Sequence, residues 1–276
     1  MHLTSHQKRI VTGLVLLALL IVCIAKGGLF MLLLVLAASL LTLYEFFCLY
    51  WPGTVYMGRK IFGLVLGALV VLSQSMDPLW TMTIVCLGFF AAGMLFLARF
   101  GRGDAEARLG HYAPLLHGII YIPLVLQLAL YLGPAEQALV LLAAVASDTG
   151  GYYAGTLWGK RKLWPSISPK KSWAGLFGGM FLCVLCTVIT GPLAEACDWR
   201  MIRLPFWGWL LAGLFLHQAA VFGDFFESAL KRSLNIKDSG AILPGHGGML
   251  DRLDSVLFVL PAFMILRLLV RILQGS

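Results

Sequence analysis

The polar residues between positions 223 and 254 are of the types that bind metal ions and phosphate groups. The stretch opens with side chains spaced three and four apart, which share one face of a helix: Asp224, Glu227, Ser228 and Lys231. It closes with Asp251 and Asp254, again three apart. Carboxylates meeting at two such helix ends would repel one another unless a cation lay between them. Hard oxygen ligands favour Mg²⁺, which takes further ligands from water and substrate phosphates.

Basic and glycine-rich residues connect these acidic ends. Lys231, Arg232 and Lys237 suit phosphate oxygens. The glycines around His246 let backbone amides approach an anion closely. A solvated loop, whose positive charge only sets the orientation of the protein in the membrane, would explain Arg232 or Lys237 alone. It explains poorly the acidic, basic and glycine residues of 223–254 taken together. His246 could be a metal ligand, a phosphate donor or a loop residue.

A second polar segment precedes this one. Asp148 lies near the end of an apolar run, and an ionisable group at membrane depth is a functional candidate by default. Ser168 and Pro169 indicate the start of a helix, where Lys170 and Lys171 could hold phosphate. The cluster at 160–162 fits a loop whose positive charge only sets membrane orientation. Glu45, in an earlier apolar run, could be a buried packing acid or a snorkelling residue at the end of the span, and it is left unassigned.

Composition identifies the class of fold. Of 276 residues, 60% are hydrophobic and 12% charged, about half the charge of a soluble domain. This excludes soluble, disordered and coiled-coil proteins and predicts an all-α, polytopic membrane bundle of about nine transmembrane helices. The nine apolar stretches are 10–25, 29–50, 61–76, 79–98, 114–132, 135–157, 173–192, 205–222 and 255–273. We expect a scaffold at 1–134 and a catalytic region at 135–276, because most polar candidates lie in the second part.

The charge distribution predicts orientation. Lys and Arg number 21 and Asp and Glu 13, a formal net charge of +8. The basic residues concentrate in alternate connections, which by the positive-inside rule places those connections and the candidate site in the cytoplasm. Short basic loops between spans do not suggest nucleic-acid binding.

The residues quoted above carry a resemblance to a known family. Residues 228–254, with Lys237-Asp238-Ser239-Gly240 and Asp251-Arg252-Leu253-Asp254, resemble the signature of the phosphatidate cytidylyltransferases. The segments 147–150 and 168–173 are also similar to that family, except that Ala174 stands where Glu or Gln is expected. The resemblance covers the C-terminal half firmly and the N-terminal half only in hydropathy.

This resemblance implies a reaction: CTP and phosphatidate give CDP-diacylglycerol and pyrophosphate. It also implies a homodimer among membrane lipids, and Mg²⁺ on Asp224 and Asp251 with K⁺ as a possible second cation. The implied catalytic residues are Asp224, Lys231, Asp251 and Asp254. The implied substrate-binding residues are Asp148, Ser168, Lys170, Lys171, Ser228, Arg232, Lys237, Asp238, His246 and Arg252. Asp148 and Asp254 are candidates for either metal support or cytidine contacts.

Two alternatives stay open from the sequence. A CTP-dependent polyprenol kinase would transfer the γ-phosphoryl group and release CDP. An ion-coupled transporter would use the intramembrane acids to bind a cation, although we find no internal repeat of the kind that transporters carry. A CDP-alcohol phosphotransferase is not favoured, because its D-G-x-x-A-R motif is absent.

Overall fold

A computed structural model describes residues 5–103, 108–199, 201–240 and 247–274, with side chains from residue 12 onward. Most of the described chain is helical, and the only strands among the described residues form one two-stranded hairpin. Apolar segments of this length become helices because hydrocarbon offers no partner to backbone N–H and C=O groups, which must bond within the segment. The predicted all-α fold is confirmed at this level.

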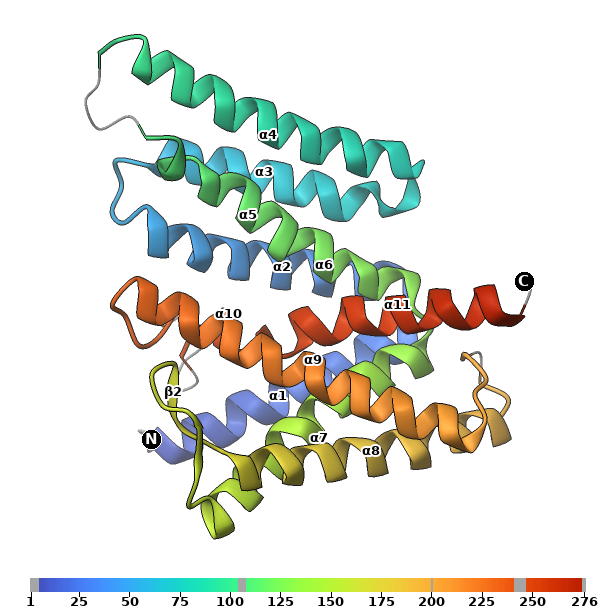
Figure 1. Ribbon diagram of the computed structural model, residues 1–276. Helices are drawn as coiled ribbons and strands as arrows, with labels where there is room; N and C mark the ends of the chain where they lie inside the picture. Colours follow the sequence, from blue (N-terminus) through green and yellow to red (C-terminus); the bar gives the residue numbers. More distant parts are fainter. Residues whose placement is uncertain (1–4, 104–107, 200, 241–246, 275–276) are drawn as a thin grey trace. The chain divides into compact units, whose positions relative to one another are not determined.

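The chain divides into two compact units. The first contains residues 1–131 and 238–250. Its helices are α1 (Ser5–Lys26), α2 (Gly28–Tyr50), α3 (Met57–Leu72), α4 (Pro78–Phe100), α5 (Ala113–Tyr121) and α6 (Pro123–Gln127), with short 3₁₀ turns η1 (Ser73–Ser75), η2 (Leu109–His111) and η3 (Leu128–Tyr131). Helices α2 to α5 pack side by side (Figure 1). The ring of Phe47 on α2 packs against Gly63 and Gly118, where a side chain would collide with it.

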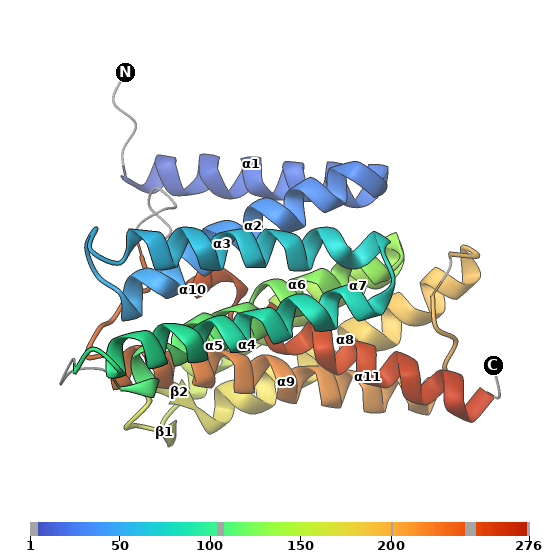
Figure 2. The same cartoon turned by 90° about the horizontal axis from the view of Figure 1, so that it is seen from above.

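The second unit contains residues 132–237 and 251–276. It is formed by α7 (Pro134–Trp158), the hairpin β1 (Lys162–Trp164) and β2 (Ser168–Ser172), α8 (Trp173–Ala196), α9 (Phe206–Ser233) and α11 (Val256–Gln274). The short helix α10 (Leu250–Leu253) begins at its boundary. Helix α9 packs against α7, α8 and α11, and Figure 2 shows α8, α9 and α11 running alongside one another.

Glycines let α7 and α8 approach at backbone distance. A Cβ atom on Gly150 would collide with the Gly178 carbonyl, and one on Gly179 would collide with the Ser147 carbonyl. Close packing of this kind is the usual role of small residues between membrane helices. It fixes the part of α7 that carries Asp148 directly against α8.

Seven helical segments in the described residues are long and apolar enough to cross a membrane: Gly28–Tyr50, Met57–Ser75, Pro78–Phe100, Ala113–Tyr131, Trp173–Ala196, Phe206–Ser233 and Leu250–Gln274. The predicted count of about nine is not confirmed. The apolar part of α1 is short, at Thr12–Lys26. Helix α7 has the necessary length, but Asp148 and its polar and glycine neighbours lower its mean hydropathy. A multi-pass helical membrane protein remains the conclusion.

The prediction that a helix starts at Ser168 and Pro169 is wrong. Both residues lie in β2, which pairs antiparallel with β1 so that Trp164 faces Ser168 and Lys162 faces Ser172. The proline explains the difference, because a residue that precedes proline is driven towards extended backbone. Helix α8 starts only at Trp173, and the Ser172 hydroxyl caps it by accepting the Gly175 N–H at 3.2 Å.

Candidate active site

A cavity of about 610 Å³ lies within the second unit. Its walls come from α7, the hairpin, α8 and α9. The charged side chains that line it are Asp148, Lys162, Lys170, Lys171 and Asp224. Glycines of α7 and α8 form much of the remaining wall, so backbone is accessible to a bound molecule there. The volume lies within the range of about 300–1,000 Å³ usual for small-molecule sites.

Lys171 and Asp224 form the central ion pair of this cavity. Lys171 Nζ lies 2.5 Å from Asp224 Oδ2 and 4.3 Å from the centre of the Phe225 ring. Asp224 Oδ1 accepts a hydrogen bond from the Ser228 hydroxyl at 3.3 Å, one turn further along α9. Both partners are partly exposed, at 24% and 30% of their side chains. The pair is therefore accessible to a ligand in the cavity.

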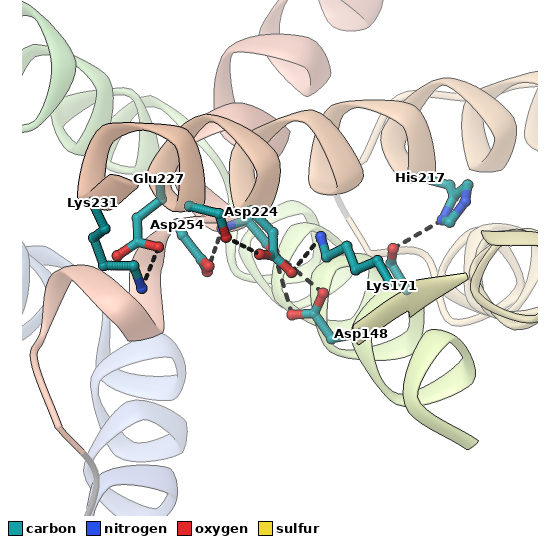
Figure 3. A network of polar contacts seen from close by, with 10 residues as sticks. Asp148, Lys171, His217, Asp224, Glu227, Lys231 and Asp254 are labelled. Carbon is teal, nitrogen blue, oxygen red and sulfur yellow. Dashed lines mark hydrogen bonds and ion pairs between the residues drawn. The ribbon is translucent and has the colours of Figure 1, made fainter. Parts of the chain in front are cut away.

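Two further carboxylates surround Asp224. Asp148 and Asp254 lie close enough that the charges of all three acids act on one another, and Figure 3 shows them gathered with Lys171. Ser255 links two of them, because its hydroxyl donates to both Asp148 oxygens at 3.3 Å and its N–H donates to Asp254 Oδ1 at 2.7 Å. Gly223 packs against the Asp254 carbonyl with no room for a side chain. Three acids therefore gather around Lys171 in this part of the unit.

A second cluster lies further along α9 (Figure 3). Lys231 Nζ contacts Glu227 Oε2 at 2.6 Å and Asp251 Oδ1 at 2.7 Å. The Glu227 side chain is only 1% exposed. A carboxylate so deeply buried needs a charged partner, and Lys231 provides it. Lys231 therefore holds α9 and the turn carrying Asp251 together in this arrangement.

The candidate residues fall into three groups. Asp148, Lys170, Lys171 and Asp224 line the cavity, Ser228 and Asp254 adjoin it, and Lys231 and Asp251 form the second cluster. Ser168 lies on β2. Arg232, Lys237, Asp238 and Arg252 are exposed. His246 lies outside the described residues. The role of every one of these residues stays a prediction.

The sequence did not single out two residues of the cavity. Lys162 lines it from β1, although its sequence context indicated only an orienting charge. His217 lines it from α9 and shares a buried 2.9 Å hydrogen bond between Nδ1 and the Ser147 hydroxyl. Neither residue has a signal in the sequence, because Lys162 reaches the cavity through a hairpin that the pattern does not indicate, and a lone histidine in an apolar run is usually a packing residue.

The donor chemistry of the site fits a hard cation. Asp148, Asp224 and Asp254 carry like charges whose repulsion a bound cation would relieve. In the described parts of the chain, however, no three His, Cys, Asp or Glu side chains are arranged closely enough to hold a metal ion. Both predicted ligands contact ammonium groups instead, Asp224 that of Lys171 and Asp251 that of Lys231. Metal binding would therefore require these lysines to move towards another anion.

Carboxylates and lysines together in one cavity, in a chain of long apolar helices, suit a membrane-embedded enzyme that acts on phosphorylated substrates. Sequence comparison makes this specific. A profile described as "Cytidylyltransferase family" matches residues 7–270. The chain belongs to this family.

Individual relatives are similar over the whole chain or over a part of it. A phosphatidate cytidylyltransferase of Staphylococcus epidermidis is 32% identical over 269 residues, covering 94% of this chain and 97% of the relative. The phosphatidate cytidylyltransferase of Bacillus subtilis is 47% identical over 116 residues, covering 42% of this chain and 41% of the relative. That of Mycobacterium tuberculosis strain H37Rv is 44% identical over 131 residues, covering 47% and 38%.

The buried cluster leads to a prediction about stability. Lys231→Met leaves Glu227 buried beside Asp251 without its cation, and loss of one partner of a buried pair costs about 3–5 kcal/mol. We expect a clearly lower thermal midpoint in detergent than for the wild type. Adding Glu227→Gln to this variant removes the buried charge and should recover more than half of the lost stability. An unchanged midpoint for Lys231→Met would contradict the assigned ion pair.

Proposed function

We propose that this protein transfers the cytidylyl group of CTP to phosphatidate, giving CDP-diacylglycerol and pyrophosphate for phospholipid synthesis. The observation that carries the proposal is the cavity lined by Asp148 and Asp224 together with Lys162, Lys170 and Lys171. Membership of the cytidylyltransferase family and the names of the relatives support the same reaction.

The nucleophile in this reaction is an oxygen of the phosphatidate phosphate. A phosphate monoester has a second pKa of about 6, so it is mostly a dianion at neutral pH and needs no strong general base. That oxygen bonds to the α-phosphorus of CTP, and the bond from the α-phosphorus to the oxygen leading to the β-phosphate breaks. The electron pair of the broken bond leaves with pyrophosphate. The main barrier is then the repulsion between two anions.

The chain's own residues would lower this barrier by positioning and by charge. Lys170 and Lys171 would hold the triphosphate, with Lys162 on the facing strand. Lys171 would exchange its contact with Asp224 for one with a phosphate oxygen. Lys231 and Arg232 would stabilise the leaving pyrophosphate. Asp148 and Asp254 keep two possible roles, metal support or cytidine contacts.

The acidic residues would hold the metal. Asp224 and Asp251 would bind Mg²⁺, which would neutralise charge on the phosphates. K⁺ is a possible second cation. The carboxylates themselves fix where this positive charge lies relative to the lysines. We also propose a homodimer in a bacterial-type cell membrane, with the site facing the cytoplasm. The support for this orientation is the concentration of Lys and Arg in alternate connections.

Product analysis tests this function. Purified protein in detergent is given phosphatidate, Mg²⁺ and CTP labelled in either the α- or the γ-phosphate. We expect the α-label in lipid and the γ-label in pyrophosphate. The γ-label in lipid with release of CDP would identify a lipid kinase instead. No nucleotide turnover by a folded sample would contradict an enzyme and favour a transporter.

A further inference from the structure

Glu45 of α2 contacts the loop of the signature segment, 205 positions away in the sequence. Glu45 Oε2 accepts a hydrogen bond from the Leu250 N–H at 3.0 Å. The same carboxyl group lies directly against the Cα atom of Gly240, where an added Cβ would fall 2.5 Å from Oε1. Gly240 and Leu250 flank the central part of the loop, and all three residues belong to the first unit. One carboxyl group thus contacts both ends of this loop.

The surroundings of Glu45 show that the contact is built into the core of the unit. Glu45 is 2% exposed, and Leu250 is fully buried. Burial of a carboxylate is costly unless it accepts hydrogen bonds, and a bond from a backbone N–H to a charged acceptor is among the stronger ones. Gly240 is required for the close approach, since any larger residue would collide with the carboxyl group. The glycine of Lys237-Asp238-Ser239-Gly240 therefore has a steric reason to be there.

The bonded amide is the first of α10. Leu250 opens the helical turn Leu250–Leu253, and the next residue along the chain is Asp251. A hydrogen bond to this amide fixes where the turn starts and how it is rotated. Rotation of a turn moves every side chain that it carries, including Asp251 and Arg252.

We propose that Glu45 is a positioning residue that holds the Leu250 amide beside Gly240 and so orients the turn carrying Asp251. The part of this proposal that concerns catalysis rests on the proposed function. Glu45 is not among the residues that line the cavity, and in this proposal it acts through the Leu250 amide.

The test combines amide exchange with kinetics on full-length protein in detergent. The variants are Glu45→Leu, which removes the acceptor, and Glu45→Gln, which keeps a carbonyl acceptor of the same shape. The control is Thr42→Val, because Thr42 is fully buried on the same helix and its hydroxyl bonds within α2, to the Ala38 carbonyl. Hydrogen–deuterium exchange is read at the Leu250 amide, and kcat and KM are read from pyrophosphate release.

We expect Glu45→Leu to speed exchange at Leu250 by about tenfold or more and to lower kcat by about 10–100-fold, the scale of a small misplacement of reacting groups. KM for CTP should change by less than about threefold. Glu45→Gln should restore most of both quantities, and Thr42→Val should alter neither.

Unchanged exchange at Leu250 in Glu45→Leu would overturn the proposal that Glu45 holds this amide. Faster exchange throughout α2 and α3, or an equal loss of kcat in Thr42→Val, would assign Glu45 to general packing and also overturn it. A wild type that releases no pyrophosphate would refute the proposed function alone, because exchange at Leu250 would still decide whether the loop is anchored.

Discussion

Replacing Asp224 with asparagine will lower kcat for pyrophosphate release by about 10³-fold, the upper range for loss of one preorganised electrostatic group. Asp224 lines the cavity, contacts Lys171 and accepts a hydrogen bond from the Ser228 hydroxyl. Asparagine keeps the size and one carbonyl oxygen but removes the charge that would hold the metal. It also leaves the Lys171 ammonium without its carboxylate. Steady-state pyrophosphate release at saturating CTP measures this effect.

The control for this variant is Asp198→Asn. Asp198 has a side chain that is 96% exposed and lies near Arg203, outside the cavity. Its substitution should leave kcat within about twofold, as is usual for exposed sites. Thermal midpoints of both variants should match the wild type. A folded Asp224→Asn protein with more than a tenth of wild-type activity would show that Asp224 is not central to the reaction.

Replacing Lys171 with methionine will lower kcat/KM by about 100–1,000-fold, with a clear rise in KM for CTP. The Lys171 ammonium group contacts Asp224 and lies 4.3 Å from the centre of the Phe225 ring. Methionine is an unbranched side chain of similar length, and it removes the charge. Both the proposed phosphate contact and the partial neutralisation of the three acids are lost. Kinetics over a range of CTP concentrations separate the binding effect from the effect on kcat.

Lys160→Met is the matched control for Lys171→Met. Lys160 lies two residues after the end of α7, in the same basic segment, but it is not among the residues that line the cavity. If the cavity is the nucleotide site, this variant should keep its KM for CTP within about twofold, since single surface charges contribute little. An equal rise in KM for both variants would mean that general positive charge, and not this cavity, attracts CTP.

Long apolar runs in the sequence predicted the helices, and helical spacing predicted which polar residues of α9 share a face. The apolar runs form helices because a membrane segment must satisfy its own backbone. The spacing in α9 placed Asp224 with Ser228 and Glu227 with Lys231, and the structure has both contacts, at 3.3 and 2.6 Å. These are interactions between residues one turn apart, which spacing alone determines.

Contacts between distant segments could not be predicted in this way. Asp148 meets Ser255 across 107 positions, and Glu45 meets Leu250 across 205. Such contacts depend on which helices become neighbours, and hydropathy carries no information about that. The hairpin was missed for a different reason: a five-residue strand of Ser, Pro and Lys has neither the apolar alternation nor the β-branched residues that indicate a strand.

The most direct test of the central claim is pyrophosphate release from CTP by purified protein in detergent, titrated with Mg²⁺, for the wild type and Asp251→Asn. The wild type should release pyrophosphate only when phosphatidate and Mg²⁺ are both present. Asp251→Asn, folded to a similar thermal midpoint, should lose nearly all of this activity at every Mg²⁺ concentration. Release that does not depend on phosphatidate, or an Asp251→Asn protein as active as the wild type, would contradict a metal-supported cytidylyl transfer at this site.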